Sequence, residues 1–205
     1  GDYVTLKYAK PCNVISYGGD HAIKPIASTT AAGTLPKKFA LSLCRIEPEN
    51  NVHMILDAFS KLATNLVFVG NWDNSEYGRQ LKSQYLDHPT ITVLNPVYDQ
   101  SDLKAIRERA SMYVHGHSAG GTNPALVEMM HFGIPVFAYD CAFNRYTTED
   151  RAIFFSATAD LCQKLSSLGN EEAKEIGNSM LRIAGINYTW EKIGAAYFDL
   201  LSTKE

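Results

Sequence analysis

The sequence predicts a doubly wound α/β domain built on a parallel β-sheet. Short, nearly continuous apolar runs alternate with amphipathic stretches along most of the 205 residues. Such apolar runs are typical of parallel strands covered on both faces, and amphipathic stretches predict the covering helices. Because this strand–helix unit recurs about five times and crossovers are right-handed, helices are expected on both faces of one sheet.

The expected elements follow one another in a regular order. The strands are expected at residues 39–43, 66–69, 91–94, 112–114 and 136–139. Helical apolar stripes, all interpreted as core contacts, fall at residues 52–62, 103–110, 126–133 and 190–201. A further short strand is expected at residues 13–17, ending in a glycine turn. The proline- and serine-containing stretch 22–37 is interpreted as a linker or a loop before the first full strand.

Composition limits the class of protein. Apolar residues make up 45% and charged residues 20% of the chain, which is ordinary for a globular protein. The net charge of −3 and the lack of a long basic run argue against nucleic acid or an anionic membrane as the main partner. No apolar run approaches the roughly 18 residues of a transmembrane helix.

The cysteines predict the redox compartment of the protein, and the first residue bears on whether the sequence is a fragment. The four cysteines are widely spaced, form no C-x-x-C pair and fit no zinc pattern. We interpret them as reduced and mostly buried, which favours a cytoplasmic protein. The sequence starts at Gly1 rather than methionine and has no signal-peptide pattern, so we interpret it as a fragment of a longer protein.

Ligands of doubly wound folds bind outside the carboxyl ends of the strands, so the residues after each strand are the candidates for a site. Arg45 follows the strand expected at 39–43 after one residue, Cys44, at the point where strand meets loop. Its planar, permanently charged guanidinium suits phosphate oxygens. The alternative is a surface arginine paired with Glu47 or Glu49.

The stretch 115–124 (HGHSAGGTNP) is the most informative part of the sequence. Gly120 and Gly121 permit close approach of the backbone to a ligand, Thr122 or Asn123 can cap the next helix, and Pro124 fits its first turn. A glycine loop before a helix start presents N–H groups and a positive dipole end, which predicts an anion site. An ordinary capped loop between strand and helix would use the same residues.

Glu128 lies one turn into the helix that follows. It falls opposite the apolar stripe and therefore faces either the ligand cleft or solvent. In the cleft, its carboxylate could accept hydrogen bonds from ribose hydroxyls. The alternative is a solvated helix carboxylate.

Several other chemistries find little support. His115 and His117 alternate along an extended segment, but no third metal ligand is near in sequence. D-x-D, G-x-G-x-x-G and P-loop motifs are absent, which argues against a metal-held diphosphate and against dinucleotide or triphosphate chemistry. The lack of a G-x-S-x-G elbow removes support for serine hydrolysis.

Four ordered stretches resemble the C-terminal domain of GT-B-fold retaining glycosyltransferases of the glycogen-synthase-like and sucrose-synthase-like class. Residues 15–20 (ISYGGD) are similar to I-x-N-G-V-D, and 43–51 to G-R-L-x-x-x-K-N. Residues 114–135 are similar to E-G-F-G-x-x-x-x-E-A-M-A-x-G-x-P-V, and 188–190 (YTW) to the F-S-W before the last helix. The resemblance covers residues 12–201 and implies a Rossmann-like domain. It divides the chain into residues 1–22, the end of an N-terminal domain with its linker, and residues 23–205, the nucleotide-sugar-binding domain.

The resemblance also implies roles for individual residues. Arg45 would hold the donor diphosphate and Glu128 the ribose, which makes them the expected catalytic residues. The family's lysine falls on Asn50 and its first glutamate on Gly120, so the sequence departs from the family at both positions. Backbone groups around Val97 would lie near the nucleotide base. Tyr98 would lie near the base ring or pack on the following helix.

Stretches 118–128 (SAGGTNPALVE) and 140–149 are similar to a bacterial branch of rhamnosyltransferases of polysaccharide assembly. The resemblance implies a hexosyl- or rhamnosyltransferase that uses deoxythymidine-diphosphate rhamnose or a related donor without metal or other cofactor. A glycan or lipid-linked acceptor would bind a missing N-terminal domain, at the inner face of a bacterial membrane, and the isolated chain would be inactive. The alternative is a non-catalytic nucleotide-sugar-binding module, and a domain without a small ligand is disfavoured.

Overall fold

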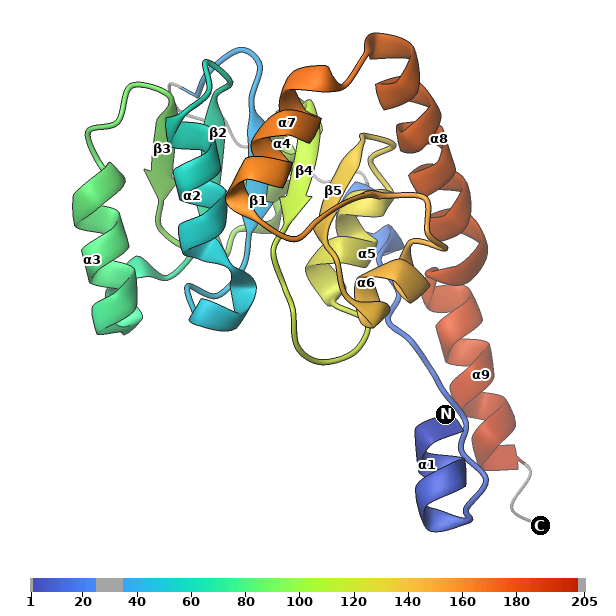
Figure 1. Ribbon diagram of the computed structural model, residues 1–205. Coiled ribbons are helices and arrows are strands. Elements are labelled where there is room, and N and C mark those ends of the chain that lie inside the picture. Colours follow the sequence, from blue (N-terminus) through green and yellow to red (C-terminus); the bar gives the residue numbers. More distant parts are fainter. Residues whose placement is uncertain (1, 25–34, 203–205) are drawn as a thin grey trace.

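The computed structural model describes residues 2–24 and 35–202 and contains one parallel β-sheet flanked by helices (Figure 1). The strands are β1 (Ala40–Leu43), β2 (Leu66–Val69), β3 (Ile91–Leu94), β4 (Met112–His115), β5 (Val136–Tyr139) and β6 (Ile153–Phe155). Their order in the sheet is β3-β2-β1-β4-β5-β6, with every neighbouring pair parallel. The α/β, doubly wound, Rossmann-like fold class is therefore confirmed.

The helices alternate with these strands. The α-helices are α1 (Asp2–Tyr8), α2 (Val52–Ser60), α3 (Glu76–Tyr85), α4 (Gln100–Arg109), α5 (Pro124–Met130), α6 (Ala142–Thr147), α7 (Thr158–Ser167), α8 (Asn170–Asn187) and α9 (Trp190–Ser202). Short 3₁₀ turns are η1 (Asp20–Ile23), η2 (Pro48–Asn50) and η3 (Trp72–Asn74). No helix in the described part of the chain is both long enough and apolar enough to cross a bilayer.

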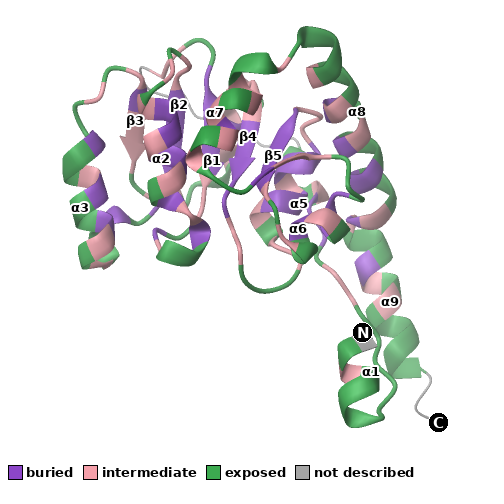
Figure 2. Ribbon diagram, in the orientation of Figure 1, coloured by how far each residue is buried: buried purple, intermediate pink, exposed green. Residues whose placement is uncertain are grey.

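Alternate side chains of the strands form two apolar cores. On one face of the sheet, Leu41 and Val67 pack with residues of α4, α5 and α8. On the other, Ala40 and Phe68 pack with residues of α2, α3 and α7. Both faces of the central strands are thus buried (Figure 2), which explains why these strands are continuously apolar in sequence.

Two local expectations were wrong, and one strand was missed. Residues 13–17 form no strand, because this segment runs beside α9, outside the sheet. The stripe at 190–201 is not a core stripe: Ile193 is its buried residue, whereas Tyr197 and Leu201 are exposed, because α9 extends away from the sheet beside α1 (Figure 1). The sequence also gave no expectation of β6. The linker assigned to residues 22–37 lies largely outside the described residues.

The cysteine interpretation is confirmed in part. All four cysteines are free, as expected for reduced thiols. Cys12 is exposed rather than buried, because the segment that carries it lies away from both cores. The other three are partly buried.

Close packing of α8 on the turn after α5 generates a stability prediction. A Cβ on Gly177 would lie 2.2 Å from the Gly133 carbonyl oxygen, whereas a Cβ on Gly185, in the same helix, would meet nothing within 4 Å. We expect Gly177→Ala to lower the free energy of unfolding by about 1–3 kcal/mol, through backbone displacement. The matched control Gly185→Ala should leave it unchanged or raise it by up to about 1 kcal/mol. Urea unfolding measures both, and equal effects would contradict this account of the packing.

Candidate functional site

The candidate site lies where the order of the strands in the sheet reverses, between β1 and β4. β2 and β3 lie on one side of β1 in the sheet, and β4, β5 and β6 lie on its other side. Loops leaving β1 and β4 therefore diverge at their carboxyl ends and leave a crevice between them. A pocket of about 420 Å³ lies at this position, within the roughly 300–1,000 Å³ typical of small-molecule sites. We call it the strand-end pocket.

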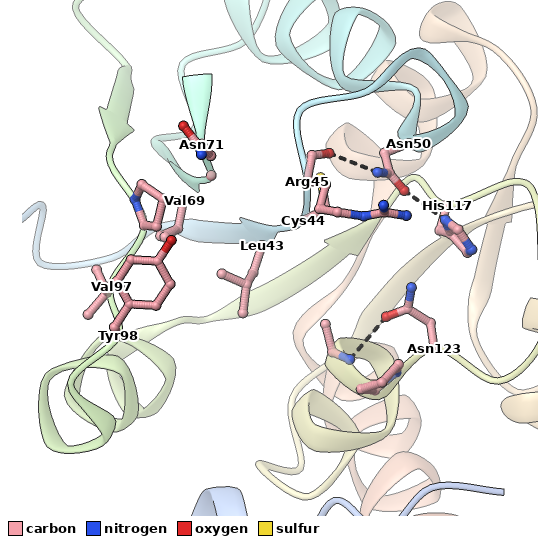
Figure 3. A pocket seen from close by; sticks show the side chains of 14 residues that line it. Leu43, Cys44, Arg45, Asn50, Val69, Asn71, Val97, Tyr98, His117 and Asn123 are labelled. Carbon is pink, nitrogen blue, oxygen red and sulfur yellow. Dashed lines mark hydrogen bonds between the residues drawn. The ribbon is translucent and has the colours of Figure 1, made fainter. Parts of the chain in front are cut away.

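The strand-end pocket has two chemically different ends (Figure 3). Arg45, Asn50, His117 and Asn123 form a polar end near β1 and β4. At the other end, the turn after β3 contributes Pro96, Val97 and Tyr98, and Asn71 lies at this end too. Tyr98 is 86% exposed, so its ring is open to a ligand rather than packed on the following helix. The pocket thus offers a cationic, hydrogen-bonding end and an apolar, aromatic end.

Backbone contacts fasten the loop after β4 to the loop after β1. A Cβ on Gly116 would lie 2.1 Å from the Asn50 carbonyl oxygen, so a glycine is needed where the two loops touch. Asn51 donates from Nδ2 to the Gly116 carbonyl (2.8 Å), and Ser118 N–H donates to the Glu49 carbonyl (2.9 Å). These contacts hold the polar end of the pocket together.

Asn50 is buried and uses both ends of its amide. Its Nδ2 donates to the Arg45 carbonyl (2.8 Å), and its Oδ1 lies 2.7 Å from Nδ1 of His117. Because Nδ2 already donates, Oδ1 is the acceptor and His117 Nδ1 carries a proton. Asn50 therefore orients both the Arg45 backbone and the His117 ring.

Arg45 projects into the pocket from the end of β1. Its side chain is 75% exposed, and its Nη2 lies 3.4 Å from Oε2 of Glu47. An exposed pair at this distance is weak, so the guanidinium remains accessible to an anion. The sequence offered two alternatives for Arg45, a place at a ligand site or a surface pair with a glutamate. In the structure, Arg45 both lines the pocket and lies near Glu47.

The start of α5 differs from the expected cradle of free N–H groups. Asn123 caps the helix as expected, since its side chain accepts from the N–H of Ala125 at 3.0 Å, and Pro124 contributes no N–H. The N–H groups of Leu126 and Val127 bind the Asn123 carbonyl at 3.1 and 3.2 Å. The N–H groups of Ala125, Leu126 and Val127 in this short helix thus already have acceptors. An anion would have to displace the Asn123 side chain to bind the Ala125 N–H.

Four of the eight residues expected to bind substrate line the strand-end pocket: Arg45, Asn50, Val97 and Asn123. Gly120, Gly121, Thr122 and Glu128 do not line it. Gly120, at φ 118°, and Gly121 lie on an exposed part of the loop. The ligand roles of all eight residues remain predictions.

Glu128 faces neither solvent nor the strand-end pocket. Its side chain is 15% exposed; one oxygen accepts from the Arg107 guanidinium of α4, and the other lies 3.1 Å from Nε2 of His21 in η1. Trp190 donates from Nε1 to His21 Nδ1 (2.9 Å), which fixes the tautomer with the proton on Nε2. The carboxylate therefore links α5 to α4, η1 and the start of α9.

His117 and Asn71 are the polar pocket residues that the sequence analysis did not assign to a ligand site. His117 was considered only as a metal ligand with His115, yet its place two residues after β4 at the sheet's reversal point was a usable signal. His115 is instead buried, and burial, with a smaller contribution from His117, lowers its pKa to about 3. The described residues contain no cluster of three or more potential metal-ligating His, Cys, Asp or Glu side chains.

A family comparison decides the class of protein. The model of the family described as glycosyl transferases group 1 matches residues 31–175. The chain belongs to this glycosyltransferase family. No curated protein matches the sequence.

Solved structures support the GT-B assignment of the fold. Sucrose-phosphate synthase (tll1590) from Thermosynechococcus elongatus aligns over 99% of this chain and 57% of its own, with a TM-score of 0.72 and 16% identity. Anabaena Alr3699/HepE in complex with UDP and glucose aligns over 82% and 49%, with a TM-score of 0.71 and 16% identity. This glycosyltransferase chain thus spans about half the length of these two proteins.

A shorter structure matches most of its own length. The C-terminal domain of the glycosyl transferase group 1 family protein LpcC from Francisella tularensis aligns over 74% of this chain and 87% of its own, with a TM-score of 0.62 and 15% identity. This chain thus shares its fold with the C-terminal domain of another glycosyl transferase group 1 family protein.

The Arg107–Glu128 pair generates a stability prediction. Arg107 is 7% exposed, so Arg107→Met would leave a nearly buried carboxylate without its guanidinium partner. We expect a loss of roughly 3 kcal/mol in the free energy of unfolding, and a smaller loss in the double variant Arg107→Met/Glu128→Met, which has no unpaired charge. Lys61→Met, in an exposed ion pair with Asp57, is the control and should change stability far less. Equal losses in the three proteins, measured by urea unfolding, would refute a buried, coupled pair.

Proposed function

We propose that this chain is the donor domain of a metal-independent, retaining glycosyltransferase that binds a nucleoside-diphosphate sugar in the strand-end pocket. The observation that carries the proposal is the pocket's division into a cationic end at Arg45 and an aromatic end at Tyr98. A nucleoside diphosphate has the same division between an anionic diphosphate and a flat base. The UDP held by the related HepE is a ligand of this class.

In this proposal the diphosphate lies beside Arg45, His117 and Asn123, and the base lies between Tyr98 and the backbone of Val97. When the sugar leaves, the bonding electron pair stays on a diphosphate oxygen, where negative charge increases. Arg45 would stabilise that charge by charge-assisted hydrogen bonds. Gly120 and Gly121 would allow the sugar to approach the loop. Glu128 is paired with Arg107 and His21 outside the strand-end pocket, so the ribose role that the resemblance implies for it is not part of this proposal.

The finer assignment follows the resemblance of residues 118–128 to bacterial rhamnosyltransferases. We propose deoxythymidine-diphosphate rhamnose, or a related hexosyl donor, and a polysaccharide or lipid-linked acceptor bound by a separate N-terminal domain. The full protein would act in the cytoplasm at the inner face of a membrane, in polysaccharide biosynthesis.

A non-catalytic nucleotide-sugar-binding module is the second candidate. Asn50 and Gly120, which stand where the family resemblance implies a lysine and a glutamate, favour it. Both candidates require nucleotide binding, so they differ in sugar transfer. An assay of the longer parent protein with deoxythymidine-diphosphate rhamnose distinguishes them: transfer with EDTA present supports the metal-independent enzyme, and binding without transfer supports the module.

The Arg45 prediction tests the diphosphate end. Arg45→Ala should weaken binding of deoxythymidine or uridine diphosphate by roughly tenfold or more, because hydrogen bonds to a charged group are lost. Affinity for the bare nucleoside should stay the same. Titration calorimetry measures both, with Arg182→Ala, an exposed arginine of α8, as the control. A folded wild-type protein without saturable binding would refute the donor-domain proposal.

The Tyr98 prediction tests the base end. Tyr98→Ala should weaken nucleoside and nucleoside diphosphate by the same factor, about tenfold, because stacking on the base is common to both ligands. Tyr98→Phe keeps the ring and should bind nearly as the wild type does. Tyr146→Ala, an exposed tyrosine outside the pocket, is the control. A loss confined to the diphosphate would place the base elsewhere.

A further inference from the structure

His117 lines the strand-end pocket and is a side chain that can gain or lose a proton near neutral pH. Its Nδ1 is occupied by Asn50 Oδ1 at 2.7 Å, and its carbonyl accepts from Asn144 Nδ2 at 2.9 Å, so the residue is held from two sides. Its Nε2 lies 3.2 Å from where a Cβ of Gly120 would be, on the side of the glycine loop. In Figure 3 the ring lies at the same end of the pocket as the Arg45 guanidinium.

The groups around His117 favour a neutral ring when no anion is bound. Burial, followed by the positive charge of Arg45, lowers the pKa of His117, and the negative charge of Glu49 opposes these effects. His115, whose ring centroid is 6.0 Å away, is itself neutral near pH 7 because its pKa is about 3. With Nδ1 protonated, Nε2 of the neutral ring is an acceptor, which would repel phosphate oxygens.

An anion bound beside Arg45 would oppose these effects on the pKa of His117. A negative group within about 4–6 Å favours the charged form of a histidine and raises its pKa. Asn50, at the position of the family's lysine, can supply no positive charge. We propose that His117 takes up a proton from solvent at Nε2 when a diphosphate binds beside Arg45, so that its imidazolium supplies the second positive charge of the site.

This proposal rests on the proposed function and adds a mechanism for handling charge. The imidazolium would donate Nε2–H to a diphosphate oxygen while Nδ1–H stays on Asn50. The direction of the pH effect follows from linkage: the pKa of His117 is higher in the complex than in the free protein, so binding weakens as pH rises through that interval. The slope is at most about tenfold in affinity per pH unit for one proton.

The experiment is titration calorimetry of the whole chain with uridine-diphosphate glucose and deoxythymidine-diphosphate rhamnose, near pH 7, in two buffers of different ionisation enthalpy. Nucleotide sugars are the correct probes because the terminal phosphate of a free nucleoside diphosphate itself titrates near a pKa of about 6. We expect uptake of a fraction of a proton, up to one, per bound ligand. His117→Gln should abolish most of this uptake and weaken binding, and its remaining affinity should not change with pH.

The control variant is His88→Gln, which removes a histidine at the opposite, amino edge of the sheet, before β3, and should keep the wild-type uptake. The wild-type pH dependence tests the proposal even if His117→Gln fails to fold. Binding without proton uptake, or equal uptake in His117→Gln and wild type, would overturn the His117 proposal and leave the donor-domain proposal standing. No saturable binding of any nucleotide would overturn the proposed function, and this inference with it.

Discussion

The close contact between the loops after β1 and β4 is the constraint on which the candidate site depends. Gly116 touches the Asn50 carbonyl so closely that no side chain fits between them, and hydrogen bonds from Asn51 and Ser118 lie on either side. Loops at this reversal of strand order otherwise diverge. The contact therefore determines where the crevice narrows, and it places Arg45 and His117 at one end of the pocket.

The apolar cores make this contact rigid. β1 and β4 are buried on both faces, and Ser42 inside the sheet satisfies its hydroxyl on the Val114 carbonyl at 2.9 Å. The polar side chains of the candidate site therefore lie at the strand ends, and the strands between the two cores are mostly apolar. α5 is fixed separately, by the pair of Glu128 with Arg107 and by its packing on α8.

The sequence predicted those parts of the structure that depend on local pattern. Apolar runs located β1 to β5 because β1, β2, β4 and β5 are largely buried on both faces and the edge strand β3 is half-buried. β6, of only three residues, is too short to carry a pattern. The apolar stripe of α9 has helical periodicity, but most of its residues are not buried. Periodicity shows that a helix has an apolar face, but it does not show whether another element covers that face. Arg45 was expected near a ligand from its position after a strand, whereas Val97 was expected there from the family resemblance, and both line the pocket. The pairing of Glu128 with Arg107 depends on how α4 and α5 pack, which no local pattern encodes.

Asn50 stands where the family resemblance implies a lysine, and the hydrogen bonds around it suit an asparagine. A lysine can only donate, so at this position it could not accept from His117 Nδ1, and its charge would lie close to Arg45 without a bound anion. An asparagine amide donates to the Arg45 carbonyl and accepts from the imidazole at once. The departure from the family pattern is therefore compatible with an intact anion site, because the missing charge can come from a neighbouring ring that asparagine holds in place.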